Sequence, residues 1–386
     1  MLRKQYQKLV IPIFLIFLLG LLSLTLPAAA QQQKQQACFT EQERALALQK
    51  AKVWQEPDPD YDPVLGYSSK TGPRMGAPQV NSDGLASPIN CTANPKPEKG
   101  SGTTPKFYCS VAGTVDEDGD LIRYKIKPHF KGQARDKRNG EIYGEFLSSR
   151  FSKALGFFAD DEWVADVTCN DCEKALTSSF QGAKFTPFQP AAGIELALGK
   201  GIDVNCNDKD TGGIAESLAR LLQAGAPRAE IDAFKLWLAF IDHGDTKTDN
   251  QKFACLKWKK NDDNTLTCEP GQAVYYVSDM GSTFGYSRSS ENKATLSGWK
   301  GKDPIKVSNG RCTTTAKSVG DANISEAGRQ LLATGLQRLL DAEKSDNLIT
   351  RVFRASRNSE RDEPAEAWTA EFIRKARTII DARCSN

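Results

Sequence analysis

The polar segment at residues 243–250, His-Gly-Asp-Thr-Lys-Thr-Asp-Asn, constrains the fold of this chain more than any other feature of the sequence. It follows an amphipathic helical pattern at 229–241, so it is expected at the end of a helix. Chance readily produces a lone His-x-Asp, but this segment also carries Lys247 and Asn250 at the spacing D-x-K-x-x-N from Asp245. A carboxylate can accept a proton, an ammonium can neutralise negative charge, and an amide oxygen can bind a metal ion. The segment therefore predicts a polar, chemically active site at the end of this helix.

A second polar segment, Asp279-Met280-Gly281, follows an apolar run at 273–277 that is expected to form a strand. Together the two segments resemble the catalytic loop (H-R-D-L-x-x-x-N) and the metal-binding D-F-G of the protein-kinase fold. The resemblance is to the atypical protein-kinase-like superfamily, in its secreted and lipid-kinase branches, and it covers about residues 99–386. It implies an α+β, two-lobed fold with a small β-rich N-lobe and a larger helical C-lobe.

The resemblance also implies a role for each polar residue of the two segments. Asp245 is expected to accept the proton of the acceptor group, and Lys247 to neutralise charge that develops on the transferred phosphate. Asn250 and Asp279 are expected to hold Mg²⁺ or Mn²⁺ against the phosphates of ATP, because these ions take oxygen ligands and few of them from the protein. ATP and a divalent cation are therefore the implied cofactors.

A kinase-like site further needs a phosphate-binding lysine on a strand and a partner glutamate on the next helix. Polarity alternates along residues 121–127, so Lys125 and Lys127 are expected on the same face of one strand. Lys127 is preferred, because a Lys-Pro at the strand end resembles the lipid-kinase and secreted-kinase branches, and Lys125 is the alternative. The following helix offers Glu145 or Glu141, which lie one turn apart. Glu145 is preferred from its distance to the end of that helix.

A glycine-rich stretch that contains Gly100 and Gly102 precedes the first strand expected in the N-lobe. Its backbone N–H groups could cradle the phosphates of a nucleotide. It is only a fragment of the G-x-G-x-x-G pattern, so a flexible linker rich in Gly and Ser is an alternative. After Asp279 the sequence has no A-P-E motif at the expected place, which argues against the peptide-docking platform of ordinary protein kinases and so against a protein acceptor. The acceptor is unknown and stays open between protein, lipid and glycan.

The N-terminus has the three parts of an export signal. Basic residues precede an apolar run at 9–26, and small residues then lead to Ala30. This pattern predicts a signal peptide over residues 1–30 with cleavage after Ala30. An uncleaved membrane anchor is the alternative, because about 18 apolar residues can begin to span a bilayer. The chain is accordingly expected to be exported, periplasmic or extracellular, with membrane contact only if this segment is retained.

Ten cysteines, an even number in a chain with an export signal, predict disulfide bonds. Cys255 and Cys268 are the best-supported pair, because they flank a polar turn at 259–264 between two strand-like runs, and a hairpin would bring them together. Cys169 and Cys172 form a C-x-x-C, but the sequence offers no second such pair at zinc-site spacing and no thioredoxin-like pattern around it. Structural disulfides are therefore expected there as well.

Composition divides the rest of the chain into three parts. Residues 31–98 are polar and rich in Pro, Gly and Asp, and are expected to form an N-terminal extension with one helix. Residues 99–200 are expected to form the kinase-like N-lobe, and residues 201–386 the C-lobe. Helices are expected at 41–53, 141–155, 214–223, 229–241, 325–340, 348–355 and 366–382, strands at 107–111, 121–127, 162–168 and 193–198, and a loop at 281–321.

Charge argues against one class of partner. The chain has 51 Lys and Arg against 48 Asp and Glu, interspersed and without a basic block, so nucleic acid is not an expected partner. The leading hypothesis is an exported, Mg- and ATP-dependent phosphotransferase of atypical kinase-like fold with an unknown acceptor, and transfer of another part of the nucleotide is an open variant of it. Two hypotheses compete with it: a non-enzymatic envelope or binding protein on a kinase-like scaffold (a pseudokinase), and a disulfide-rich domain in which the motifs are coincidental.

Overall fold

The computed structural model describes residues 38–93, 106–116, 119, 121–128, 139–171, 187–202, 213–263, 265–285, 294–358 and 362–385. They belong to one compact unit, residues 38–386. The expected signal peptide, the glycine stretch with Gly100 and Gly102, and Cys172 of the C-x-x-C lie outside the described residues. The unit contains helices and several sheets, which makes it an α+β structure.

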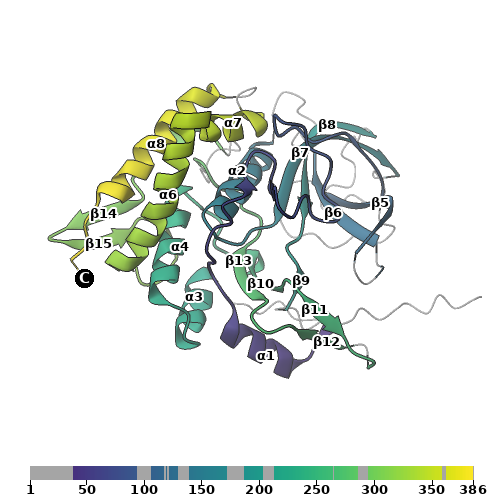
Figure 1. The fold of residues 1–386 in the computed structure, drawn as a ribbon, viewed down its shortest axis with the longest axis horizontal. Helices are drawn as coiled ribbons and strands as arrows, with labels where there is room; N and C mark the ends of the chain where they lie inside the picture. The colour runs from purple at the N-terminus through teal and green to yellow at the C-terminus, as the bar shows by residue number, and fades with distance from the viewer. Residues whose placement is uncertain are drawn as a thin grey trace, which may run out of the picture. The chain divides into compact units, whose positions relative to one another are not determined.

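Five strands close into a small barrel in the first half of the unit (Figure 1). They are β4 (Ile89–Ala93), β5 (Phe107–Val115), β6 (Leu121–Lys127), β7 (Asp161–Asn170) and β8 (Phe188–Leu196). Their order is β4-β5-β6-β8-β7, with β4 parallel to β7 and the other neighbouring pairs antiparallel. The four strands predicted for this region correspond to β5, β6, β7 and β8, with some bounds shifted by a few residues.

Apolar and polar side chains alternate along β6, so the strand contributes both to the barrel core and to a polar face. Its apolar side chains belong to the core of the barrel: Ile122, Tyr124 and Ile126. The side chains between them point to the opposite face, where Lys125 and Lys127 lie. Lys127 is nevertheless only 2% exposed, so this face is covered by other parts of the structure.

The N-terminal extension contributes to the barrel, which corrects the boundary predicted between residues 98 and 99. Strand β4 comes from the predicted extension, pairs with β5 and β7, and is linked to β5 by the Cys91–Cys109 disulfide. The boundary predicted at 200 also fails, because it cuts β9 (Lys200–Gly201), which pairs with β10 (Gln251–Cys255). The sequence did not predict β4, because its alternation of buried and exposed residues covers only five positions in a polar, Pro-rich segment.

The rest of the extension forms short elements. They are β1 (Cys38–Phe39), α1 (Glu41–Lys50), β2 (Tyr61–Asp62) and β3 (Tyr67–Ser68). The helix predicted at 41–53 ends at Lys50, because the following residues pair with β13 (Ala273–Val277) instead. Lys52 N donates to the carbonyl of Ala273 at 3.0 Å, and Lys52 O accepts from Tyr275 N at 2.8 Å.

Helix α2 (Gly140–Ala154) packs against β7 and β8 and agrees with the helix predicted at 141–155. The Asn139 side chain caps its N-terminus by accepting a hydrogen bond from Glu141 N at 3.2 Å. Gly156, at φ +87°, allows the chain to leave the helix in the left-handed region. The centroid of the Phe151 ring lies 4.8 Å from that of Phe372 and 5.7 Å from that of Phe353. Aromatic packing therefore fixes α2 against α7 (Leu348–Ala355) and α8 (Ala365–Asp381).

Helices dominate the second half of the unit. They are α3 (Ile214–Gln223), α4 (Arg228–Phe240), the 3₁₀ turn η4 (Thr248–Asn250), α5 (Leu296–Trp299), α6 (Glu326–Asp346), α7 (Leu348–Ala355) and α8 (Ala365–Asp381). The remaining strands are β11 (Trp258–Lys260), β12 (Thr265–Cys268), β14 (Ile305–Ser308), β15 (Arg311–Thr314) and β16 (Asn323–Ile324). Helix α6 packs on α4, α7 and α8 (Figure 1), and β10 pairs antiparallel with β13.

The loop predicted at 281–321 is wrong in part, because it contains α5 and the β14–β15 hairpin. Asn309 and Gly310 form the hairpin turn, with φ of 49° and 77°. Asn-Gly is the dipeptide that tight hairpins favour, since both residues tolerate positive φ. The signal was therefore present in the sequence.

Three disulfides link described residues: Cys91–Cys109, Cys255–Cys268 and Cys312–Cys384. The second is the pair expected from the sequence. Three disulfides are consistent with an oxidising, exported compartment. Within the described part of the chain, no helix combines the length and apolar character needed to cross a membrane.

Replacing Cys255 and Cys268 together by alanine is expected to lower the free energy of unfolding by about 3 kcal/mol or less, because the disulfide closes a short loop. Urea unfolding of the oxidised protein measures the change. The Cys312–Cys384 pair is the matched comparison: its sequence separation is 72 against 13, so its removal should destabilise the protein more. The reverse order would contradict this explanation.

Candidate active site

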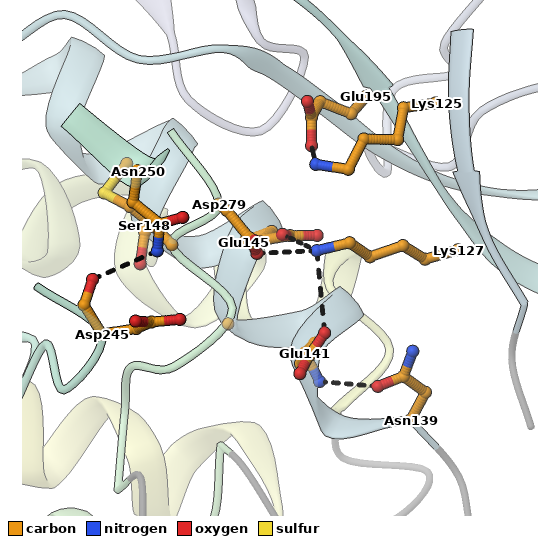
Figure 2. A network of polar contacts seen from close by, with 12 residues as sticks. Lys125, Lys127, Asn139, Glu141, Glu145, Ser148, Glu195, Asp245, Asn250 and Asp279 are labelled. Atoms are coloured by element: carbon orange, nitrogen blue, oxygen red, sulfur yellow. Dashed lines mark hydrogen bonds and ion pairs between the residues drawn. The ribbon is translucent and has the colours of Figure 1, made fainter. Parts of the chain in front are cut away.

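Lys127 is the centre of a polar cluster between the barrel, α2 and the segment after β13 (Figure 2). Its ammonium is ion-paired with Glu145, donates to Asp279 Oδ1 at 2.8 Å, and lies 3.7 Å from Glu141 Oε2. An ammonium group has three donors, so one side chain can hold several carboxylates at once. This single buried group therefore connects three parts of the fold.

The structure places the residues that the sequence offered as alternatives in different surroundings. Lys127 is ion-paired with Asp279, whereas the ion pair of Lys125 is with a glutamate of β8. Glu141 and Glu145 lie on the same face of α2, and both approach Lys127 (Figure 2), but Glu145 makes the direct hydrogen bond. The residues brought together are thus the preferred ones of each pair.

Asp279 occupies a strained position at the end of β13. Its φ is +53°, in the left-handed region that few non-glycine residues adopt, although aspartate tolerates it better than most. Its side chain is 25% exposed, while that of its partner Lys127 is 2% exposed. Strain of this kind persists only where the surroundings enforce it, and it concentrates at functional sites.

The charges in this cluster stabilise one another against the cost of burial. Burial would raise the pKa of Asp279, but the ammonium groups of Lys127 and Lys125 hold it well below its usual range. Burial would likewise lower the pKa of Lys127, but Asp279 and Glu145 raise it well above the usual value. Lys127 and Asp279 are therefore both charged at neutral pH.

The segment expected to be catalytic forms the connection from α4 to β10. The Asp245 side chain is 29% exposed, and its Oδ2 lies 2.9 Å from Lys247 Nζ. Asn250 is only 2% exposed, and its Nδ2 donates to the backbone oxygen of Asp245 at 3.1 Å. This hydrogen bond uses the amide nitrogen, so the amide oxygen of Asn250 is available as a metal ligand.

Backbone hydrogen bonds join this segment to the one that carries Asp279. They run from Gly244 N to Ser282 O (2.9 Å), from Ser278 N to Asn250 O (2.9 Å) and from Phe284 N to Ile241 O (2.6 Å). Because backbone bonds leave little freedom in register, the segment with Asp245 and Asn250 is held beside the segment with Asp279, and Asp279 is the one of the three that contacts Lys127 (Figure 2). The structure therefore gathers the residues that the two sequence segments singled out.

Two glycines allow α2 to approach the Asp279 segment closely. A Cβ on Gly281 would lie 2.8 Å from Cβ of Glu141, and a Cβ on Gly144 would lie 2.8 Å from the carbonyl oxygen of Gly281. Real Cβ atoms do not approach other atoms so closely. The glycine of the Asp-x-Gly motif is thus required here by packing against the helix that carries Glu145.

Replacing Gly281 by alanine is expected to push α2 away and to destabilise the protein by about 1–3 kcal/mol, the usual cost of overpacking. Urea unfolding measures this change. Gly213→Ala is the matched control, because a Cβ there would meet only the Thr246 carbonyl oxygen at 3.7 Å, an ordinary contact. Equal stability of the two variants would show that α2 does not need the close approach.

Sequence reasoning missed three acidic residues behind Lys127, namely Asp160, Glu162 and Glu195. Glu162 and Glu195 are cross-strand partners on β7 and β8, and Glu195 also pairs with Lys125. A signal existed, because a glutamate within a strand whose neighbours are apolar has to be buried or paired. Which glutamates would meet depends on strand register, which the sequence does not state.

No family model matches this sequence, and no curated protein is significantly similar to it. Among solved structures, the chain is similar to the crystal structure of a Helicobacter pylori proinflammatory kinase, CtkA, at 11% sequence identity. The alignment covers 76% of this chain and 96% of that chain, with a TM-score of 0.38. A TM-score of this size is too low to establish a common fold, so the site is interpreted from its own residues.

Proposed function

We propose that the protein is a phosphotransferase of atypical kinase-like fold that uses ATP and a divalent cation. One observation carries the proposal: buried Lys127 is bound at once to a helix glutamate, Glu145, and to the aspartate of the Asp-x-Gly segment, Asp279. Phosphoryl transfer by kinases requires a lysine oriented by such a glutamate and a metal-binding aspartate beside it. The barrel and the helical second half would then serve as the two lobes.

The donor set fits a hard divalent cation. Asp279 offers carboxylate oxygens, of which Oδ1 accepts from Lys127, and Asn250 offers its amide oxygen. Mg²⁺ and Mn²⁺ favour oxygen ligands and bind with few from the protein. When bound, the cation would supply charge neutralisation on the phosphates.

The remaining residues would position the reactants and move a proton. Lys127 would contact the phosphates, with Glu145 fixing its direction. Asp245 would accept the proton of the acceptor hydroxyl as that oxygen bonds to the γ-phosphorus and ADP leaves. Lys247, 2.9 Å from Asp245, would neutralise charge on the transferred group.

The proposal is tested by incubating the oxidised protein with Mg²⁺ or Mn²⁺ and ATP labelled at the γ-phosphate, with α-labelled ATP in parallel. We expect label from the γ-position in the protein or in an added protein, lipid or glycan acceptor. Incorporation of α-label would instead indicate transfer of the nucleotidyl group. Nucleotide binding without any transfer would favour a pseudokinase scaffold over an enzyme.

A further inference from the structure

Three glutamates from three elements converge behind Lys127. Glu145 comes from α2, Glu162 from β7 and Glu195 from β8, and one carboxylate oxygen of each lies within 4.8 Å of the others. Glu145 and Glu162 are 2% and 5% exposed, so water has little access to the cluster. Buried carboxylates that face one another repel unless a cation or a proton lies between them.

The lysines of the site neutralise only part of this cluster. Lys127 binds Oε1 of Glu145, and Lys125 binds Oε2 of Glu195 (Figure 2), so one oxygen of each glutamate is not used by a lysine. The carboxylate of Glu162 makes no hydrogen bond or ion pair with any residue that the structure describes. A carboxylate on a side chain that is only 5% exposed and has no hydrogen-bond or ion-pair partner is rare, because its desolvation costs several kcal/mol.

A small void lies beside these carboxylates. Its volume is about 10 Å³, close to what a single water molecule or ion requires. Four acidic residues are among those that line it, Glu145, Asp160, Glu162 and Asp279, whereas Glu195 is not. Burial and the charges of Glu145 and Glu195 raise the pKa of Glu162 well above its usual range, which reflects the excess of negative charge.

We propose that Glu145, Glu162 and Glu195 form a binding site for a divalent cation that does not require nucleotide. The site would be distinct from the one formed by Asn250 and Asp279 for the metal of the nucleotide. Its donors are all carboxylate oxygens, which favours Mg²⁺, Mn²⁺ or Ca²⁺ over the softer zinc and copper ions. A cation here would bind the oxygen of Glu145 that Lys127 does not use, and so fix α2 to β7 and β8.

The experiment titrates Mn²⁺ into the full chain with its disulfides intact and without nucleotide, and follows free Mn²⁺ by electron paramagnetic resonance. Thermal unfolding is recorded with and without Mn²⁺. We expect one Mn²⁺ per chain and a higher melting temperature with the ion. Glu162→Gln keeps the size of the side chain, and we expect it to weaken Mn²⁺ binding by at least about ten-fold.

Three further variants identify the site. Glu195→Gln should weaken binding as Glu162→Gln does. Glu216→Gln, on an exposed glutamate of α3, and Asn250→Ala, in the nucleotide-metal site, should both keep nucleotide-free Mn²⁺ binding. The proposal is overturned if the wild-type protein binds no Mn²⁺ without nucleotide, if Glu162→Gln binds it as tightly as wild type, or if Asn250→Ala alone abolishes binding. These results do not depend on whether the protein transfers phosphate.

Discussion

Replacing Asp245 by asparagine is expected to slow phosphoryl transfer by roughly two to four powers of ten, the usual contribution of a general base, and to leave ATP affinity close to that of the wild type. The reason is that Asp245 is placed to act on the acceptor, whereas Lys127 and Asp279 are placed to hold the nucleotide and its metal. An interaction made only in the transition state lowers kcat and not nucleotide binding. The measurement is γ-label transfer beside an ATP titration on the same variant.

Asp249→Asn is the matched control for Asp245→Asn, because it removes a carboxylate from the same connection between α4 and β10. It should transfer phosphate at a rate close to that of the wild type. If Asp245→Asn also turns over like the wild type, Asp245 is not the base. If it loses nucleotide binding as well, its role is structural.

Lys127→Met is expected to abolish productive ATP binding and to destabilise the protein by roughly 3 kcal/mol, because it leaves the carboxylates of Glu145 and Asp279 buried without their cation. Methionine keeps much of the apolar stem, so lost packing contributes little. Urea unfolding and an ATP titration measure the two effects. Lys125→Met is the matched variant, because it removes a buried lysine from the same face of β6. If Lys125→Met loses ATP binding and Lys127→Met keeps it, the two lysines have been assigned the wrong way round.

The loss of stability in Lys127→Met should depend on pH in a defined direction. In the wild type the pKa of Asp279 is depressed, so its contribution to stability is present above the unfolded-state pKa of about 3.9 and is lost as the pH falls through the lower folded-state value. Without Lys127, burial would raise the pKa of Asp279 above its unfolded value, and would raise further the pKa of Glu145, which burial already holds above its usual range in the wild type. The difference in the free energy of unfolding between the wild type and Lys127→Met should therefore shrink on going from about pH 8 to about pH 5. A deficit that is constant over this range would mean that lost packing, and not lost charge pairing, causes it.

The parts of the site that could be predicted are those set by local pattern. Alternation along β6 placed Lys125 and Lys127 on one face, and helical periodicity placed Glu141 and Glu145 on one face of α2. The preference within each pair came from the kinase resemblance, because local pattern does not state which lysine would meet Asp279 or which glutamate would bond to that lysine. That meeting is determined by how α2 packs on the Asp279 segment, where Gly281 and Gly144 allow the close approach.

The parts that could not be predicted depend on long-range pairing. Strand β4 closes the barrel through a parallel pairing with β7, and no local feature of a short polar segment predicts a partner so far along the chain. Glu162 and Glu195 meet only because β7 and β8 pair in one register, with an irregularity between Ala165 and Val167. The carboxylate cluster behind Lys127 is therefore a property of the assembled sheet.

A calorimetric titration of ATP into the wild-type protein and into Asp279→Ala, with Mg²⁺, with Mn²⁺ and with a chelator, tests the nucleotide site most directly. We expect metal-dependent binding of one ATP to the wild type, and strong weakening in Asp279→Ala, because that variant lacks a carboxylate that would hold the metal at the phosphates. Absence of ATP binding with either metal, or binding that is equal in Asp279→Ala and independent of metal, would contradict the claim that these residues form a nucleotide site.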